Sequence, residues 1–381
     1  MESEIGLYFH FPFCKQKCNY CDFNSYCGIE DLIPGYMEAM ILEVERDLPQ
    51  SRPVGSIYFG GGTPSVLPPD LLVYFLNFIR DNFLLKDKTE ITLEINPGTT
   101  NLDALILFKN AGFNRLSIGL QAVQDRLLQT IGRIHRWLDF QQIYESAREV
   151  GFDNINIDLI FGLPGQTIAD WKESLEKVTQ LKPEHISAYG LQLEEETPLD
   201  KLVKSGSLTL PPEDVVVEMM QWVMNFLPEA GYQQYEISNY SKPEYQSRHN
   251  LYYWIGHDYL GFGAGACSTF QQHRWSNWAE PREYINKILK GYPVVEESET
   301  IDRSIAAIER LMLGLRLRKG IDLKDFQDEF QIDLTKKLRK EIAQLQSNGL
   351  VNLTKSHLSL TDKGVLLSNT VIADLIGILN E

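Results

Sequence analysis

Short apolar runs alternate with amphipathic segments through the first half of the chain. The runs are rich in β-branched and aromatic residues and predict six strands: GLYFHF, SIYFGGG, ITLEINP, RLSIGLQ, NINIDLIFG and HISAYGLQ. Apolar positions at helical spacing predict helices between them, over residues 31–48, 70–83, 138–150 and 167–181. Near-continuous apolar strands, each followed by a crossover helix, indicate an α/β fold with a parallel sheet, either doubly wound or a full or partial barrel.

Polar and glycine residues gather where these predicted strands end. They are Gly60 to Thr63, Glu94, Gln121 and Asp158. In parallel α/β folds the carboxyl ends of the strands form one face, and ligands bind there. We therefore expect a functional site on that face.

The strand and helix rhythm stops after about residue 195, where PPEDVVVEMMQWVMNFLPEAGY predicts a helix. An aromatic-rich stretch follows, and from residue 301 the pattern predicts three helices and a short hairpin, the order of a winged helix. We therefore divide the chain into a core over residues 1–240, an aromatic-rich connecting segment over 241–298 and a smaller α+β C-terminal domain over 299–381.

Composition and charge limit the classes of partner that we expect for the chain. The chain of 381 residues has a formal net charge of -16, and the segment from residue 301 carries nearly equal numbers of basic and acidic residues, so nucleic acid is an unfavourable partner. The start, MESEIGLYFHFPFC, lacks the basic region of a signal peptide, and no apolar run is long enough to span a bilayer. We expect a cytoplasmic protein without a transmembrane segment.

Three of the five cysteines, Cys14, Cys18 and Cys21, are clustered in CKQKCNYCDF. Three thiols suit neither a disulfide nor a closed tetrahedral zinc site, although zinc bound with a distant histidine stays open. Three thiolates on a [4Fe-4S] cluster would leave one iron without a protein ligand. An exchangeable molecule could bind that iron.

The segment CKQKCNYC after a first strand, with Tyr20 just before the third cysteine, resembles the radical S-adenosylmethionine (SAM) superfamily. The resemblance implies a partial barrel of six strand and helix units. It also implies that Cys14, Cys18 and Cys21 hold a [4Fe-4S] cluster, and that SAM binds the fourth iron and can be cleaved for radical chemistry.

The same resemblance assigns residues to SAM. FGGGTP would bind the SAM ammonium through its backbone, and Glu94, Gln121 and Asp158 offer groups suited to the amine and the ribose hydroxyls. Arg133 matches an arginine that holds the SAM carboxylate, with Arg136 as the alternative. The full set is Tyr8, Tyr20, Gly61, Gly62, Thr63, Glu94, Gln121, Arg133, Asp158 and Ala188. Core packing is the competing interpretation for Tyr8 and Ala188.

Within the superfamily the chain is most similar to a group that contains oxygen-independent coproporphyrinogen III oxidase and the HemW-type heme chaperones. The oxidase pattern has a fourth cysteine where this sequence has Phe23, and Cys27 lies too far along to replace it. The oxidase also carries a longer N-terminal segment, which we expect to be absent here. Both features favour the chaperone.

RHNLYYW contains the HNxxYW pattern of that chaperone group. The resemblance implies a heme site formed by His249, Asn250, Tyr253 and Trp254, and an imidazole beside aromatic rings suits heme. A core-facing aromatic segment with a hydrogen-bonded histidine is the alternative. His257, His10 and His273 are candidate second ligands.

The leading hypothesis is a heme chaperone that holds a [4Fe-4S] cluster and SAM, binds heme and transfers it to an acceptor apoprotein. The alternative is oxidative decarboxylation of coproporphyrinogen III or another radical SAM reaction, for which no catalytic residue is assigned. A nucleic-acid-binding regulator ranks last because of the acidic charge. A homodimer is left open.

Overall fold

A computed structural model describes residues 4–379. Its centre is a 12-stranded sheet in the order β12-β11-β10-β9-β1-β2-β3-β4-β5-β6-β8-β7. The six middle strands run parallel in chain order. They are β1 Ile5–Phe11, β2 Val54–Gly61, β3 Leu85–Ile95, β4 Arg115–Gln121, β5 Ile155–Phe161 and β6 His185–Gly190. The predicted α/β class with a parallel sheet of six strands is confirmed.

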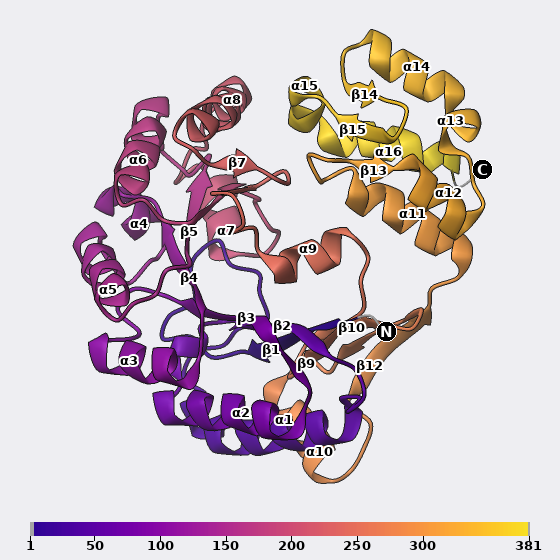
Figure 1. Ribbon diagram of the computed structural model, residues 1–381. Coiled ribbons are helices and arrows are strands. Elements are labelled where there is room, and N and C mark those ends of the chain that lie inside the picture. The colour runs from indigo at the N-terminus through magenta and orange to yellow at the C-terminus, as the bar shows by residue number, and fades with distance from the viewer. Residues whose placement is uncertain (1–3, 380–381) are drawn as a thin grey trace.

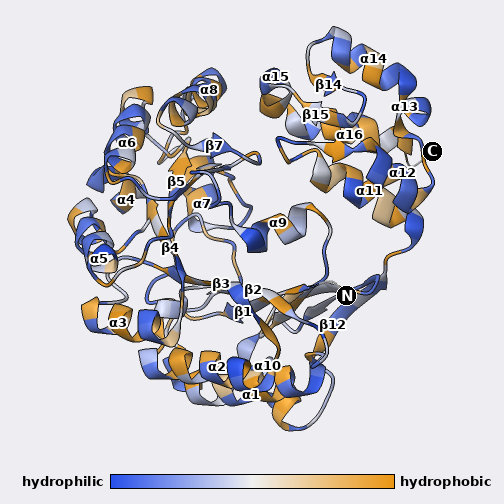
Figure 2. Cartoon of the chain, viewed as in Figure 1, coloured by the Kyte–Doolittle hydropathy of each residue, from blue (hydrophilic) through white to orange (hydrophobic). Residues whose placement is uncertain are grey.

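Helices cover the outer face of the curved sheet (Figure 1). They are α1 Ile33–Asp47, α2 Pro69–Asn82, α3 Leu102–Ala111, α4 Asp125–Thr130, α5 Trp137–Glu149 and α6 Ile168–Gln180. Four of them match the predicted ranges to within two residues at each end, because their apolar positions follow the helical period. Both hydrophilic and hydrophobic residues occur along these helices (Figure 2), and their apolar residues pack on the sheet.

The second half of the chain extends the sheet at both edges. At one edge, β9 pairs with β1 in parallel and starts an antiparallel run through β12, and at the other, β8 and β7 pair antiparallel beside β6. Their bounds are β7 Gln233–Gln234, β8 Asn239–Ser241, β9 Tyr259–Phe262, β10 Cys267–Phe270, β11 His273–Asn277 and β12 Val295–Thr300. The helices are α7 Pro198–Lys204, α8 Glu213–Glu229, α9 Arg248–Trp254 and α10 Pro281–Leu289.

The C-terminal part has its own core, built around Leu311, Leu315, Phe326, Leu358 and Leu375. Its elements are α11 Arg303–Gly314, β13 Ile321–Asp322, α12 Leu323–Phe330, α13 Leu334–Lys337, α14 Arg339–Ser347, β14 Val351–Leu353, β15 His357–Leu360, α15 Asp362–Leu366 and α16 Ser368–Leu379. The predicted helices and hairpin are present, and the hairpin joins a small sheet ordered β13-β15-β14. The boundaries of the three predicted segments stay a prediction.

Within residues 4–379, no helix combines the length and the apolar character that crossing a bilayer requires. The exposed edge strand β12 carries three glutamates, Glu296, Glu297 and Glu299. Charge on an open edge discourages pairing with another chain.

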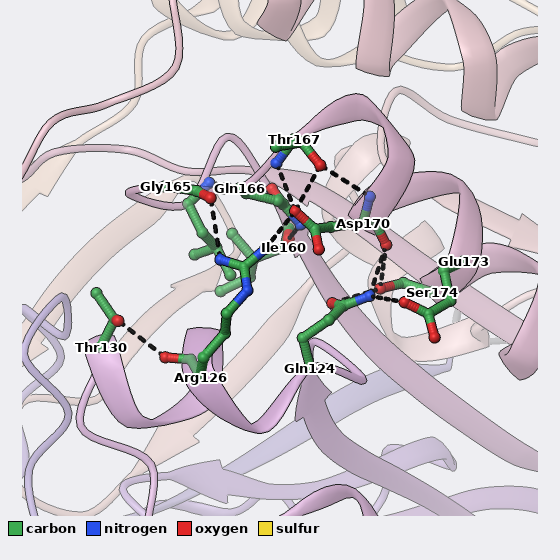
Figure 3. A network of polar contacts seen from close by, with 11 residues as sticks. Gln124, Arg126, Thr130, Ile160, Gly165, Gln166, Thr167, Asp170, Glu173 and Ser174 are labelled. Atoms are coloured by element: carbon green, nitrogen blue, oxygen red, sulfur yellow. Dashed lines mark hydrogen bonds and ion pairs between the residues drawn. The ribbon is translucent and has the colours of Figure 1, made fainter.

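A polar network fixes the loop between β5 and α6 (Figure 3). Thr167 and Asp170 form a capping box, since each side chain accepts a hydrogen bond from the other's backbone amide. Arg126 on α4 binds Asp170 at 2.5 Å and the carbonyl of Gly165 at 3.0 Å. Gln166 donates to the carbonyl of Ile160 at 3.3 Å, which ties the loop back to the end of β5.

A buried carboxyl joins α1 to the edge strands. Glu43 accepts hydrogen bonds from the Tyr284 hydroxyl at 2.6 Å, the Gly263 amide at 2.9 Å and the Asn277 side chain at 2.6 Å. Burial raises the pKa of Glu43 to about 7, from its ordinary value of 4.5. The ionised form is therefore harder to accommodate in the folded chain than in the unfolded one.

This carboxyl generates a pH-dependent prediction. In the unfolded state Glu43 releases its proton near pH 4.5 and in the folded state near 7, so its contribution to stability is lost as the pH rises between these values. Glu43→Gln removes the titration while keeping the shape. We expect the wild type to lose stability relative to this variant between about pH 5 and 8 in urea unfolding.

Glu45, exposed on the same helix, provides the matched control Glu45→Gln for the loss of a carboxyl group. A difference between wild type and Glu43→Gln that is constant across the pH range would contradict the prediction.

Candidate functional site

A cavity of about 470 Å³ opens among the cysteine loop, the carboxyl ends of the parallel strands and the inner face of the sheet. Most of the residues predicted from the sequence line it. They are Cys14, Cys18, Tyr20, Cys21, Gly61, Gly62, Thr63, Glu94, Gln121, Arg133, Asp158 and Asn250. The structure thus brings together side chains that are up to 236 positions apart in the chain, from Cys14 to Asn250.

The loop after β1 presents the three clustered thiols to this cavity. Backbone hydrogen bonds from Tyr26 to Pro12 at 2.8 Å and from Cys14 to Tyr26 at 2.9 Å close the loop at its base. Lys17 donates to the carbonyls of Phe23 at 2.9 Å and Ser25 at 3.2 Å, which holds its far side. These hydrogen bonds hold the loop at its base and along its far side.

The three thiols have different surroundings. Cys14 Sγ lies 3.5 Å from the Thr63 hydroxyl, and Cys18 Sγ accepts a contact from Arg133 at 3.5 Å. Burial raises the pKa of Cys14 and Cys21, so without a metal both are held as thiols. Within the described residues, no three His, Cys, Asp or Glu side chains converge on a single metal ion. Three separated thiols beside one cavity fit a cluster in which each takes a different iron.

The glycine loop at the end of β2 packs directly under the cysteine loop. The amides of Gly62 and Thr63 donate to the carbonyls of Phe11 and Phe13, both at 2.8 Å. A Cβ on Gly62 would lie 2.8 Å from the Phe13 carbonyl oxygen, so no larger residue fits. The amides of Gly62 and Thr63 are therefore engaged in the contact with the cysteine loop.

Two carboxyl groups face the cavity from β3 and β5. Glu94 accepts a hydrogen bond from the Tyr58 hydroxyl at 2.7 Å, and burial raises its pKa to about 7. Asp158 accepts from Ser117 at 3.1 Å and from the Asn156 amide at 2.9 Å, and burial raises its pKa as well. A cationic amine near Glu94 would favour its ionised form.

Gln121 reaches the cavity through an unusual backbone conformation. Its φ is 73°, in the left-handed region, and the pairing register between β4 and β5 shifts between Gly119 and Gln121. A residue other than glycine in this region is strained, and such positions cluster at functional sites. The bulge turns the side chain toward the cavity.

Arg133 spans the cavity wall between the cysteines and the strand ends. Its guanidinium donates to Asn96 Oδ1 and to the Gly119 carbonyl, both at 2.5 Å. Asn96, which the sequence interpretation missed, also donates to the Thr63 hydroxyl at 2.8 Å. A chain of contacts thus runs from Arg133 through Asn96 and Thr63 to Cys14. Arg136, the alternative, is exposed at the start of α5 and does not line the cavity.

Two predicted residues lie behind the cavity wall. The Tyr8 hydroxyl is 3.1 Å from His10 Nδ1, and Ala188 is buried between Ser187 and Tyr189, which do line the cavity. Direct contact of Tyr8 and Ala188 with SAM stays a prediction.

Helix α9, which carries the HNxxYW pattern, lies on the inner side of the curved sheet, opposite the outer helices (Figure 1). His249 is only 1% exposed, and its two ring nitrogens contact the Ser56 hydroxyl at 2.9 Å and the Tyr253 hydroxyl at 2.8 Å. Burial, with Arg115 nearby, lowers the pKa of His249 to about 3, so the ring is neutral. Asn250 lines the cavity, whereas Trp254 lies outside it beside Arg316.

The candidate second histidines differ in access. His10 is buried and contacts the Asn24 carbonyl at 2.8 Å, and His273 is exposed on β11. His257 stacks on Tyr252 with ring centroids 5.3 Å apart, and its buried Nδ1 has no partner among the described residues. None of the three lines the cavity.

Sequence reasoning also missed Arg115, a buried residue that lines the cavity. It begins β4, and Ser117, Gly119 and Gln121 follow at every second position. Because side chains alternate across a strand, this period of two could have placed Arg115 on the same face as the predicted Gln121.

The chain is similar to known proteins over nearly its whole length. Models of the radical SAM superfamily and of the HemN C-terminal domain match residues 8–178 and 303–367. The heme chaperone HemW of Bacillus subtilis is 37% identical over 98% of this chain and 99% of its own length, and that of Lactococcus lactis is 34% identical over 97% of each. The structure of coproporphyrinogen III oxidase (HemN) from Escherichia coli covers 100% of this chain and 90% of its own at a TM-score of 0.86 and 24% identity, which shows the shared fold.

The placement of the cysteines generates a prediction about iron. After anaerobic reconstitution with iron and sulfide, Cys14→Ala, Cys18→Ala and Cys21→Ala should each lose the broad visible absorption of an iron–sulfur cluster, because each thiol faces the cavity. Cys27→Ser and Cys267→Ser are the matched controls, since both cysteines are exposed and outside the cavity, and should keep it. Retention of full iron and sulfide by any of the three alanine variants would refute the ligand set.

Proposed function

Because this chain belongs to the HemW family of heme chaperones within the radical SAM superfamily, we propose that it binds heme alongside a SAM-ligated [4Fe-4S] cluster and passes the heme to an acceptor apoprotein. The observation that carries the proposal is the arrangement of one cavity. It is lined on one side by the three clustered cysteines and on another by Asn250 of the HNxxYW pattern. Cluster and heme chemistry would thus share one cavity.

The superfamily uses a [4Fe-4S] cluster and SAM, and the residues present fit both groups. Cys14, Cys18 and Cys21 would hold the cluster, and a reduced cluster with SAM bound supplies one-electron chemistry. The protein's own contribution is to hold the cofactor's polar groups. Glu94 would accept from the amine, and Asp158 from the ribose hydroxyls.

Arg133 would hold a carboxylate, and its Nε has no hydrogen-bond partner among the described residues. Its guanidinium now donates to the Asn96 side chain and the Gly119 carbonyl, and the planar fork can present two parallel donors to a carboxylate. The nearby contact with Cys18 supports this position, because it places the arginine next to a cluster ligand.

Heme would bind near α9. His249 is held neutral, which is the form that ligates iron, and the rings of Tyr58 and Tyr253 lie 5.1 Å from it by centroid distance. Since Tyr253 contacts Nε2, ligation through that nitrogen requires the tyrosine hydroxyl to give up its hydrogen bond. Direct ligation by His249, and the roles of Asn250, Tyr253 and Trp254, are parts of the proposal.

Phe23 supports the chaperone over decarboxylation of coproporphyrinogen III. It lines the mouth of the cavity and is 64% exposed, at the position where the oxidase pattern has a fourth cysteine. An exposed phenyl ring offers a flat apolar contact and no ligand to iron. We place the protein in the cytoplasm, because its clustered free thiols suit a reducing compartment. The homodimer stays a prediction.

The position of Arg133 leads to a prediction about SAM binding. Arg133→Gln should weaken SAM binding to the reconstituted protein about 10-fold to 100-fold, because a charge-assisted hydrogen bond contributes about 1.5–3 kcal/mol. Arg136→Gln is the control and should bind SAM like the wild type, since Arg136 is exposed outside the cavity. Equilibrium dialysis with labelled SAM would measure both. Equal loss in the two variants would contradict the assignment.

The second prediction concerns heme. His249→Leu should lose stoichiometric heme binding and its Soret band, whereas Tyr253→Phe should bind heme at least as tightly as the wild type, because it frees Nε2 of His249. His357→Gln, on β15, controls for the loss of a histidine. Full heme binding by His249→Leu would remove this residue from the site.

The function itself is tested by one anaerobic experiment on the reconstituted protein. We expect stoichiometric heme uptake and transfer to an apoprotein acceptor, followed by absorbance of the acceptor, and no conversion of coproporphyrinogen III. Robust decarboxylation, or no heme uptake by the wild type, would overturn the chaperone proposal.

A further inference from the structure

Arg115 is a charged side chain for which the proposed cluster and SAM site has no use. It opens β4, is 1% exposed and is among the largest fully buried side chains, yet it lines the cavity. Burying a guanidinium costs several kcal/mol unless its donors are paired. Its partners therefore determine what it does.

Among residues 4–379, the guanidinium of Arg115 has no hydrogen-bond partner, and no carboxylate oxygen lies within the 4 Å of an ion pair. Its Nε is buried without a partner, and so is the hydroxyl of Thr92, the residue opposite it in the β3–β4 register. Donors left unused at a cavity wall are the pattern of a site that awaits an acceptor.

The neighbouring acids are engaged elsewhere. Asp158 accepts from Ser117 and Asn156, and Glu94 accepts from Tyr58. Glu90 accepts from the backbone amides of Arg248 and His249 at 3.1 and 3.0 Å. These carboxyls act on Arg115 through space and keep it charged, but they do not take its donors.

Arg115 is also separate from the arginine proposed for SAM. Arg133 contacts the carbonyl of Gly119, four residues further along β4, which at about 3.3 Å per residue is roughly 13 Å along the strand. The two arginines therefore lie at different depths in the cavity, with Arg133 beside the cysteines and Arg115 toward the start of the strand.

We propose that Arg115 anchors a second anion subsite, deep in the cavity, that takes a carboxylate carried by the ligand, of the class found on the propionate side chains of heme. The identity of that ligand rests on the proposed function. The planar fork of the guanidinium can present two parallel donors to a carboxylate, which would supply the missing acceptors. His249 lies on the same side of the sheet, and its ring senses the charge of Arg115.

The test compares heme with heme dimethyl ester, which keeps the iron porphyrin and lacks both free carboxylates. The wild-type full-length protein should bind heme about tenfold or more tightly than the ester, as titrated by the Soret band. Arg115→Gln should bind both with similar affinity, and Arg136→Gln should keep the wild-type preference. Arg115→Lys, which keeps the charge without the fork, should fall between them and serves if the glutamine variant does not fold.

The outcomes distinguish a failure of the Arg115 subsite from a failure of the proposed heme-binding function. Equal affinity of the wild type for the two porphyrins, or an unchanged preference in Arg115→Gln, overturns the subsite while heme binding stands. No uptake of either porphyrin by the wild type overturns the proposed function and the subsite with it.

Discussion

The site depends on the contact between two loops that leave neighbouring strands. The amides of Gly62 and Thr63 at the end of β2 donate to the carbonyls of Phe11 and Phe13 after β1, and the missing side chain of Gly62 makes this approach sterically allowed. The hydroxyl of Thr63 then meets Cys14, and through Asn96 it connects to Arg133. This backbone contact thus fixes the positions of the cysteine loop and of Arg133 relative to the cavity wall.

The inner face of the sheet departs from the usual rule that parallel strands are apolar on both faces. Toward the outer helices the strands bury residues such as Phe9, Phe59 and Leu93, whereas toward the cavity they present Glu94, Arg115 and Asp158. Desolvation raises the pKa of the two carboxyls, and the arginine is left without an ion-pair partner in residues 4–379. Charged side chains on this face of the sheet can bind a ligand, but their desolvation lowers the stability of the fold.

The sequence allowed the parallel core and most of the cavity lining to be predicted, because apolar periodicity and strand ends are local signals. It did not reveal that β9 to β12 extend the sheet beside β1, since strand pairing across about 250 residues leaves no local trace. Asn96 and Arg115 were missed for a related reason. Asn96 matters because it joins Thr63 to Arg133, and Arg115 matters because its Nε has no partner, and only the folded arrangement decides either.

The two sides of the cavity differ in the hydrogen bonds that their residues already make. The cysteine loop is braced by its own hydrogen bonds, across its base and from Lys17. On the side proposed for heme, both ring nitrogens of His249 are hydrogen-bonded within the protein, to Ser56 and Tyr253. Ligation through Nε2 would require the Tyr253 hydroxyl to give up its hydrogen bond, and a neutral hydrogen bond contributes about 0.5–1.5 kcal/mol net. A heme carrier has to release heme as well as bind it. In the proposed site, His249 can return to its hydrogen bond with Tyr253 when heme leaves, which would favour release.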